Sequence, residues 1–130
     1  MRGRTESVIA AYRPKPGKDS ELRRLVREHR VALDEARLVS ARPTILLRAR
    51  SDGTVLEIFE WASAKAADEA HQNPALRALW GRFARIADFI PLSAIQESDR
   101  AFSHFEALAP DKPSVRQLAR KAAPVKRAKR

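Results

Sequence analysis

The stretch that decides the fold is Thr44-Ile-Leu-Leu-Arg-Ala-Arg50, followed by Ser51-Asp52-Gly53 and then Thr54-Val-Leu-Glu-Ile-Phe-Glu-Trp61. Two runs rich in β-branched and aromatic residues around a turn signal predict a β-hairpin. Asp-Gly supplies the positive φ that tight hairpin turns require. Both strands have apolar residues at odd and at even positions, so we expect the sheet to be apolar on its two faces.

One strand and one helix precede this hairpin. Ser7 to Arg13 is a short strand that ends at Pro14-Lys15-Pro16-Gly17. Asp19 or Ser20 is the expected N-cap of the helix that follows. That helix has one stripe of residues at helical spacing, which predicts its core-facing side: Leu22, Leu25, Val26, His29, Ala32, Leu33 and Ala36.

A second helix and a last strand follow the hairpin. Ser63 is the expected N-cap of the Ala-rich segment Ala64 to His71, and Asn73-Pro74 interrupts the helix because proline lacks a backbone donor. The helix resumes with a second apolar stripe: Leu76, Leu79, Trp80, Phe83, Ile86 and Ala87. Leu92 to Glu97 is the expected last strand, and Ala101 to Leu108 is expected to pack back on the domain.

The resulting order is β-α-β-β-α-β, which predicts an α+β protein of ferredoxin-like topology. Its four-stranded antiparallel sheet would carry two helices on one face. The opposite face is also apolar, and a large exposed apolar face usually marks an interface or a ligand groove. We therefore expect two copies to pair sheet to sheet as a homodimer.

Composition predicts one domain and a tail. The 130 residues suffice for one domain, here 1–109. Residues 110–130 carry eight Lys and Arg and one Asp, which is most of the net charge of +10. Few large apolar residues accompany them, so we expect a disordered basic tail whose contacts with nucleic acid would be weak and salt-sensitive.

The chain has no Cys, which excludes disulfides and thiolate chemistry and fits a reducing compartment. No apolar run reaches the roughly 20 residues of a membrane span or the ~7–15 residues of a secretory leader. The sequence therefore predicts a cytoplasmic protein without a membrane span.

Several motifs together resemble the antibiotic biosynthesis monooxygenase-like family of dimeric α/β-barrel proteins. They are Pro14-Lys15-Pro16-Gly17-Lys18 closing the first strand, Glu57-Ile-Phe-Glu-Trp-Ala-Ser63 entering helix two, Ala70-His71-Gln72-Asn73-Pro74, and Leu79-Trp80. The similarity covers about residues 7–108. It implies a dimeric α/β barrel with a pocket between sheet and helices in each subunit, and relatives that include cofactor-independent monooxygenases acting on polyketide quinols and haem-degrading enzymes.

Two histidines are candidate catalytic residues. His71 ends the Ala-rich segment, where an imidazole would bind or deprotonate a phenolic or enolic substrate near neutral pH. The alternative is a helix-end histidine bonded to frayed carbonyls, or paired with Asp68 or Glu69. His29 lies on the apolar stripe of helix one and needs a polar partner, for which Glu57 or Glu60 is expected.

Glu57 and Glu60 are the candidate carboxylates. Their opposite parity places them on opposite faces of the strand, so we expect one to meet the helices and the other the dimer side. A buried carboxylate would assist a base, whereas a salt bridge to Arg48 or Arg50 across the hairpin is the alternative. Parity alone leaves open which of the two faces the pocket.

Aromatic residues at strand and helix positions would line an apolar pocket for a flat ligand, unless they serve only as core: Tyr12, Phe59, Trp61, Trp80 and Phe83. No Gly-rich phosphate loop occurs, and three scattered histidines predict no metal site. The first strand lacks the Asn that haem-degrading relatives carry there, so we expect no cofactor.

Two functions follow from these patterns. In the first, the pocket binds an aromatic or quinone-like molecule, with cofactor-independent oxygenation as the candidate reaction and His71 as base or clamp. In the second, the chain is a non-catalytic dimeric regulatory or stress module whose basic tail contacts nucleic acid or an acidic partner. His104 is expected on the surface in both.

Overall fold

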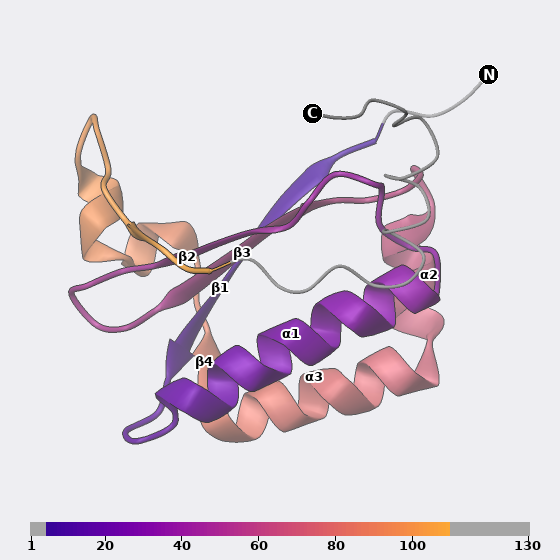
Figure 1. Cartoon of the computed structure of the whole chain (residues 1–130), viewed down its shortest axis with the longest axis horizontal. Helices are drawn as coiled ribbons and strands as arrows, with labels where there is room; N and C mark the ends of the chain where they lie inside the picture. The colour runs from indigo at the N-terminus through magenta and orange to yellow at the C-terminus, as the bar shows by residue number, and fades with distance from the viewer. Residues whose placement is uncertain (1–4, 110–130) are drawn as a thin grey trace, which may run out of the picture.

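The computed structural model describes residues 5–109, so the predicted tail lies outside the described residues. The described chain is an α+β fold with one open antiparallel sheet (Figure 1). Its strands are β1 (Ser7–Pro14), β2 (Ile45–Arg48), β3 (Val55–Glu60), β4 (Ala87–Phe89) and β5 (Glu106–Ala107). Its α-helices are α1 (Asp19–Glu35), α2 (Ala66–Gln72) and α3 (Pro74–Ile86), none of which is long and apolar enough to cross a membrane.

The sheet has the order β4-β1-β3-β2-β5. The predicted hairpin is confirmed, because β2 pairs with β3 in antiparallel register and Gly53 in the turn has a φ of 79°. The expectation of four strands is wrong by one: residues 106–107 of the segment expected to pack back form β5 beside β2. With that addition, the architecture is compatible with a ferredoxin-like fold.

The helices lie together on one side of the sheet, with α1 and α3 side by side (Figure 1). The expected caps of the first two helices are wrong, because Lys18 and Lys65 precede α1 and α2 and neither makes a side-chain capping bond. The Asn73-Pro74 break is confirmed. Asn73 ends α2 and caps α3, since its Oδ1 accepts from the Leu76 amide at 3.1 Å.

Two core clusters fill the space between the helices and the inner face of the sheet. One contains Leu22, Leu25 and Val26 of α1 packed with Tyr12 and Phe83. The other is made by residues of the end of α1 and the loop after it, of β3 and of the second helical region, among them Leu33, Val39, Phe59, Ala70 and Leu76. These contacts hold α1 and α3 at fixed positions over β1 and β3, where the candidate residues lie.

The predicted last strand, Leu92 to Glu97, is wrong. Two 3-10 helices occupy this segment, η1 (Leu92–Ala94) and η2 (Gln96–Asp99), and the strand that closes the sheet is β4, directly after α3. Local bonds explain the difference, because the Ser98 hydroxyl donates to the carbonyls of Leu92 and Ile95 at 2.9 and 2.7 Å. These bonds favour tight turns over an extended ladder.

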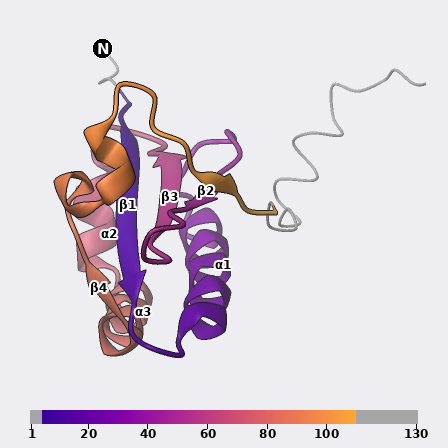
Figure 2. The same cartoon turned by 90° about the vertical axis from the view of Figure 1, so that its left-hand side faces the viewer.

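The 3-10 segment covers part of the outer face of the sheet, the face away from the helices (Figure 2). Ile95 is 1% exposed and packs against Ala11, Ala49 and Leu56. The expectation that the helices alone cover the sheet, leaving its other face bare, is therefore wrong for this half of the outer face.

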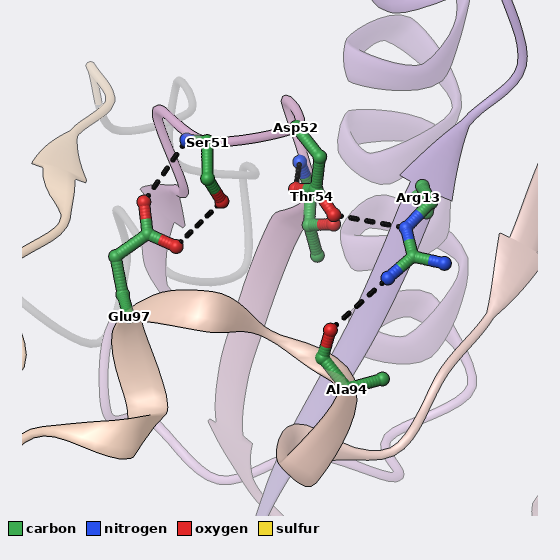
Figure 3. A network of polar contacts seen from close by, with 6 residues as sticks. All are labelled: Arg13, Ser51, Asp52, Thr54, Ala94 and Glu97. Atoms are coloured by element: carbon green, nitrogen blue, oxygen red, sulfur yellow. Dashed lines mark hydrogen bonds and ion pairs between the residues drawn. The ribbon is translucent and has the colours of Figure 1, made fainter.

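Polar contacts fasten the 3-10 segment to the hairpin turn (Figure 3). The Ser51 amide and hydroxyl donate to the two Glu97 oxygens at 3.0 and 2.7 Å. Arg13 donates to Asp52 at 2.9 Å and to the Ala94 carbonyl at 3.1 Å. Because these groups are largely exposed, we assign most of the segment's stability to Ile95 rather than to these polar contacts.

The uncovered half of the outer face carries a row of isoleucines. Ile9 and Ile45 lie opposite Ile58 in the register of β1, β3 and β2, and the first two are 46% and 53% exposed. This row is the part of the sheet that retains the apolar surface expected from the sequence.

Replacing Ile95 with Ala should lower the free energy of unfolding by about 2–4 kcal/mol, because it removes a fully buried side chain. Urea unfolding followed by circular dichroism measures this change. Leu92→Ala is the matched control in the same segment, and since Leu92 is 41% exposed, its cost should stay below about 0.5 kcal/mol. Equal small costs for both variants would show that Ile95 does not anchor the segment.

Candidate functional site

The parity of β3 separates the two candidate carboxylates. Glu57 faces the helices and is fully buried, with an exposed fraction of 0%. Glu60 lies on the opposite face, where it accepts from Arg42 Nε at 3.1 Å and from the Thr5 hydroxyl at 3.2 Å. Hydrogen bonding from the Ser40 side chain, with Thr5 and Arg42 adding to it, lowers the pKa of Glu60.

The alternative salt bridges across the hairpin are wrong. Arg48 pairs instead with Glu106 of β5 at 3.3 Å. No ion pair joins Arg50 to Glu57 or Glu60 within residues 5–109. Glu57 is therefore held by a different set of partners.

Glu57 receives hydrogen bonds from β1 and from α1. The Tyr12 hydroxyl donates to Oε1 at 2.6 Å. His29 Nδ1 lies 3.0 Å from both carboxylate oxygens. The expected partnership of His29 with one of the two glutamates is confirmed, and its partner is Glu57.

Trp80 fixes which nitrogen of His29 carries the proton. Its indole Nε1–H lies 3.0 Å from His29 Nε2. Because an indole is only a donor, Nε2 must accept and the single proton of the neutral imidazole resides on Nδ1. Nδ1–H then donates to Glu57. Every hydrogen bond in this network, which consists of Trp80, His29, Glu57 and Tyr12, is therefore directed toward the Glu57 side chain. Glu57 accepts without donating, as an ionised carboxylate does.

The same network keeps Tyr12 protonated. Burial, the negative charge of Glu57 and the hydrogen bond to Glu57, in that order, raise the pKa of Tyr12 well above its ordinary value of 10.0. The ring of Tyr12 stacks on Phe83, with centroids 4.7 Å apart. Tyr12 therefore acts as a neutral donor at any pH near neutrality.

A pocket of about 290 Å³ opens beside this network. We call it the aromatic pocket. Its lining combines two small or aliphatic side chains with seven ring systems from both layers of the fold: Val8, Ala10, Tyr12, His29, Phe59, Trp61, His71, Trp80 and Phe89. The volume is near the lower end of the ~300–1,000 Å³ of ligand pockets, which suits a small ring system.

His71 stands at the exposed part of this lining. Its Nδ1 lies 2.8 Å from the Ala67 carbonyl, which can only accept, so Nδ1 carries the proton. Its ring lies 5.2 Å from that of Trp80, centroid to centroid. The bond to a helix carbonyl agrees with the structural alternative for this residue, yet it also leaves Nε2 with the free lone pair that a base requires.

The structure brings six of the nine candidate residues to the aromatic pocket: Tyr12, His29, Phe59, Trp61, His71 and Trp80. Glu57 lies behind them, bonded to Tyr12 and His29, and Phe83 is fully buried behind Tyr12. Glu60 lies on the other face of the sheet. His104 is exposed, as expected.

Sequence reasoning missed three lining residues, Val8, Ala10 and Phe89. The first two share the parity of Tyr12 on β1, a signal that points them to the same face. Phe89 had no such signal, because the strand that carries it was expected several residues later. Phe89 contacts Tyr12 edge-on with centroids 5.7 Å apart.

Two larger hollows lack such chemistry. A groove of about 520 Å³ runs between α1 and α3, and a hollow of about 550 Å³ lies along the 3-10 segment. Neither gathers convergent buried polar groups, which is why we assign the candidate site to the smaller pocket. Within the described chain, no three His, Cys, Asp or Glu residues are placed to hold a metal ion.

Comparison of the chain with protein-family models, with curated proteins and with solved structures finds no match. The assignment of the site therefore depends on its own geometry.

The single tyrosine of the chain makes the network measurable, because absorbance near 295 nm then reports on Tyr12 alone. We expect no ionisation of the folded protein up to clearly above pH 10. Because the pKa of Tyr12 is higher in the folded protein than in the unfolded chain, neutral Tyr12 makes its full contribution to the free energy of unfolding below about pH 10. This contribution declines as the pH rises further. Glu57→Gln should lower the Tyr12 pKa only partly, because burial remains.

Glu60→Gln is the control, since Glu60 does not contact Tyr12, and it should leave the titration unchanged. Ionisation of Tyr12 near pH 10 while circular dichroism still shows the native fold would contradict the buried bond to Glu57.

Proposed function

We propose that the chain binds a small, flat aromatic or quinone-like molecule in the aromatic pocket. The observation that carries this proposal is the convergence of five carbocyclic rings on one opening beside a buried polar network: Tyr12, Phe59, Trp61, Trp80 and Phe89. Rings from both layers offer faces and edges for stacking, and His71 supplies a polar contact, since both ring nitrogens of His29 are already bonded to Glu57 and Trp80. Kinship with the antibiotic biosynthesis monooxygenase-like family is part of this proposal.

The candidate reaction is oxygenation of the bound molecule without metal or flavin. It requires a base that removes a proton from the substrate, dioxygen as co-reactant and a cavity that limits water. His71 is the proposed base, because the bond from Nδ1 to the Ala67 carbonyl places the lone pair of the neutral ring on Nε2. His29 is less suited, since Trp80 already occupies its Nε2.

Both tryptophans of the chain line the pocket, so intrinsic fluorescence reports directly on its occupancy. Titration with 1,4-naphthoquinone should quench this emission with saturation. His71→Ala should weaken binding about three- to tenfold, because one ring contact and one polar contact are lost. Oxygen uptake with 1,4-dihydroxynaphthalene tests the reaction, and it should fall in the same variant.

His104→Ala is the matched control, an exposed histidine outside the pocket, and it should behave as wild type. Linear quenching without saturation, identical in all three proteins, would overturn the proposed binding function.

We further propose that two copies pair through the uncovered half of the outer sheet face. The isoleucine row of Ile9, Ile45 and Ile58 supports this, since it crosses three strands and two of its members are about half exposed. Burial of apolar sheet surface against a second copy stabilises the dimer, because it removes that surface from water. The area is smaller than the sequence suggested, because the 3-10 segment covers the rest.

Ile45→Lys should shift a dimer toward monomer at micromolar concentration, since a charge would be placed in the apolar contact. Sedimentation velocity measures the distribution. Val31→Lys is the matched control, because Val31 is 40% exposed on α1 and lies away from the sheet. A wild-type protein that sediments as a monomer at high micromolar concentration would contradict the pairing.

The alternative function is that of a non-catalytic regulatory or stress module whose basic tail contacts nucleic acid or an acidic partner. One observation favours it: Ala109, the last described residue, lines the same small hollow as Arg23 and Arg27 of α1. The basic segment 110–130 thus continues from a place that is already basic. This function makes no use of the aromatic pocket, so the ligand titration separates it from the first.

A further inference from the structure

We propose that the aromatic pocket prefers a positively charged aromatic molecule, such as an N-alkylated nitrogen heterocycle, over neutral and anionic molecules of equal shape. This inference depends on the proposed binding function and adds the charge of the ligand. Its basis is the juxtaposition of aromatic rings with the buried Glu57 carboxylate.

The first step is the charge behind the pocket wall. Glu57 is fully buried, and its partners Tyr12 and His29 both line the pocket. Both are neutral donors, because Trp80 requires His29 Nε2 to be unprotonated and Tyr12 retains its proton. The negative charge of Glu57 is therefore spread by hydrogen bonds but is not cancelled by a cation within this network.

The second step is the lining itself. Neither Lys nor Arg lines the pocket among residues 5–109. Among the described residues, the one other titratable group at its opening is His71. Five ring faces and edges, two of them indole, surround the space, and aromatic faces attract cations through their quadrupoles.

The third step is magnitude. A unit charge roughly 6 Å from a carboxylate, at an effective dielectric constant of about 20, gains enough Coulomb energy for about a hundredfold in affinity. Removing the cation from water offsets part of this gain. We therefore expect a net preference of about tenfold for a cation over its neutral isostere. An anion should bind at least tenfold more weakly than the neutral molecule.

The same charge bears on the candidate reaction. A substrate anion formed inside the pocket would be repelled by Glu57, so a base at His71 would act against this field. A cationic heterocycle is instead attracted by Glu57. Its positive charge is stabilised in the pocket without any proton transfer. The electrostatics of the site thus favour recognition of a cation over generation of an anion.

The test uses three bicyclic probes of similar size with the full chain at pH 8: N-methylquinolinium, 1-methylnaphthalene and 1-naphthoate. Isothermal titration calorimetry gives each affinity. The expected order is cation, neutral, anion. Glu57→Gln retains an acceptor oxygen but removes the charge, so it should reduce the cation preference to less than about threefold while binding of the neutral probe changes little.

Glu60→Gln is the matched control on the same strand and should preserve the wild-type order. Equal affinities, or tightest binding of the anion by the wild-type protein, would overturn the inference while leaving the binding function intact. Absence of binding for all three probes would overturn the binding function as well. If Glu57→Gln does not fold, the wild-type order alone supports or refutes the preference.

Discussion

A buried carboxylate on the central region of the sheet constrains the rest of the structure. Glu57 lies under the helices with no exposed surface, and an ionised group in such a place must receive hydrogen bonds. Its direct bonds come from two elements, Tyr12 on β1 and His29 on α1, and His29 in turn accepts from Trp80 on α3. One hydrogen-bonded network centred on a single acidic side chain therefore connects β1, β3 and both long helices.

This constraint also shapes the pocket. Tyr12, His29 and Trp80 belong at once to the network and to the lining, so their rings cannot rotate freely without leaving a buried donor or acceptor unpaired. The pocket is consequently preorganised, which lowers the entropy that a ligand must lose on binding. The carboxylate behind these rings gives the preorganised pocket a negative electrostatic potential, which apolar packing alone does not provide.

Part of this arrangement could be read from the sequence, for reasons that particular residues make plain. A two-residue strand period places Glu57 and Glu60 on opposite faces, and a histidine on the stripe of α1 demands a polar partner. Neither pattern identifies which glutamate faces inward. That follows from tertiary register, since Tyr12 lies diagonally across from Glu57 on the neighbouring strand and can reach it.

Other features depended on local bonds that periodicity does not reveal. Leu92 to Glu97 has the composition of a strand, yet the Ser98 hydroxyl bonds to two carbonyls and bends the segment into 3-10 turns. Those turns carry Ile95 onto the outer face of the sheet, which leaves a smaller apolar surface for a second copy than an uncovered sheet would have. The order of elements was predictable, whereas the covering of the sheet was not.

The most direct test of the account is nitrogen NMR of the His29 ring in uniformly ¹⁵N-labelled protein at neutral pH. The predicted spectrum shows a protonated Nδ1 and an unprotonated Nε2, with the Trp80 indole proton shifted by its bond to that Nε2. A proton on Nε2, alone or together with one on Nδ1, would contradict the donor order that ends on Glu57.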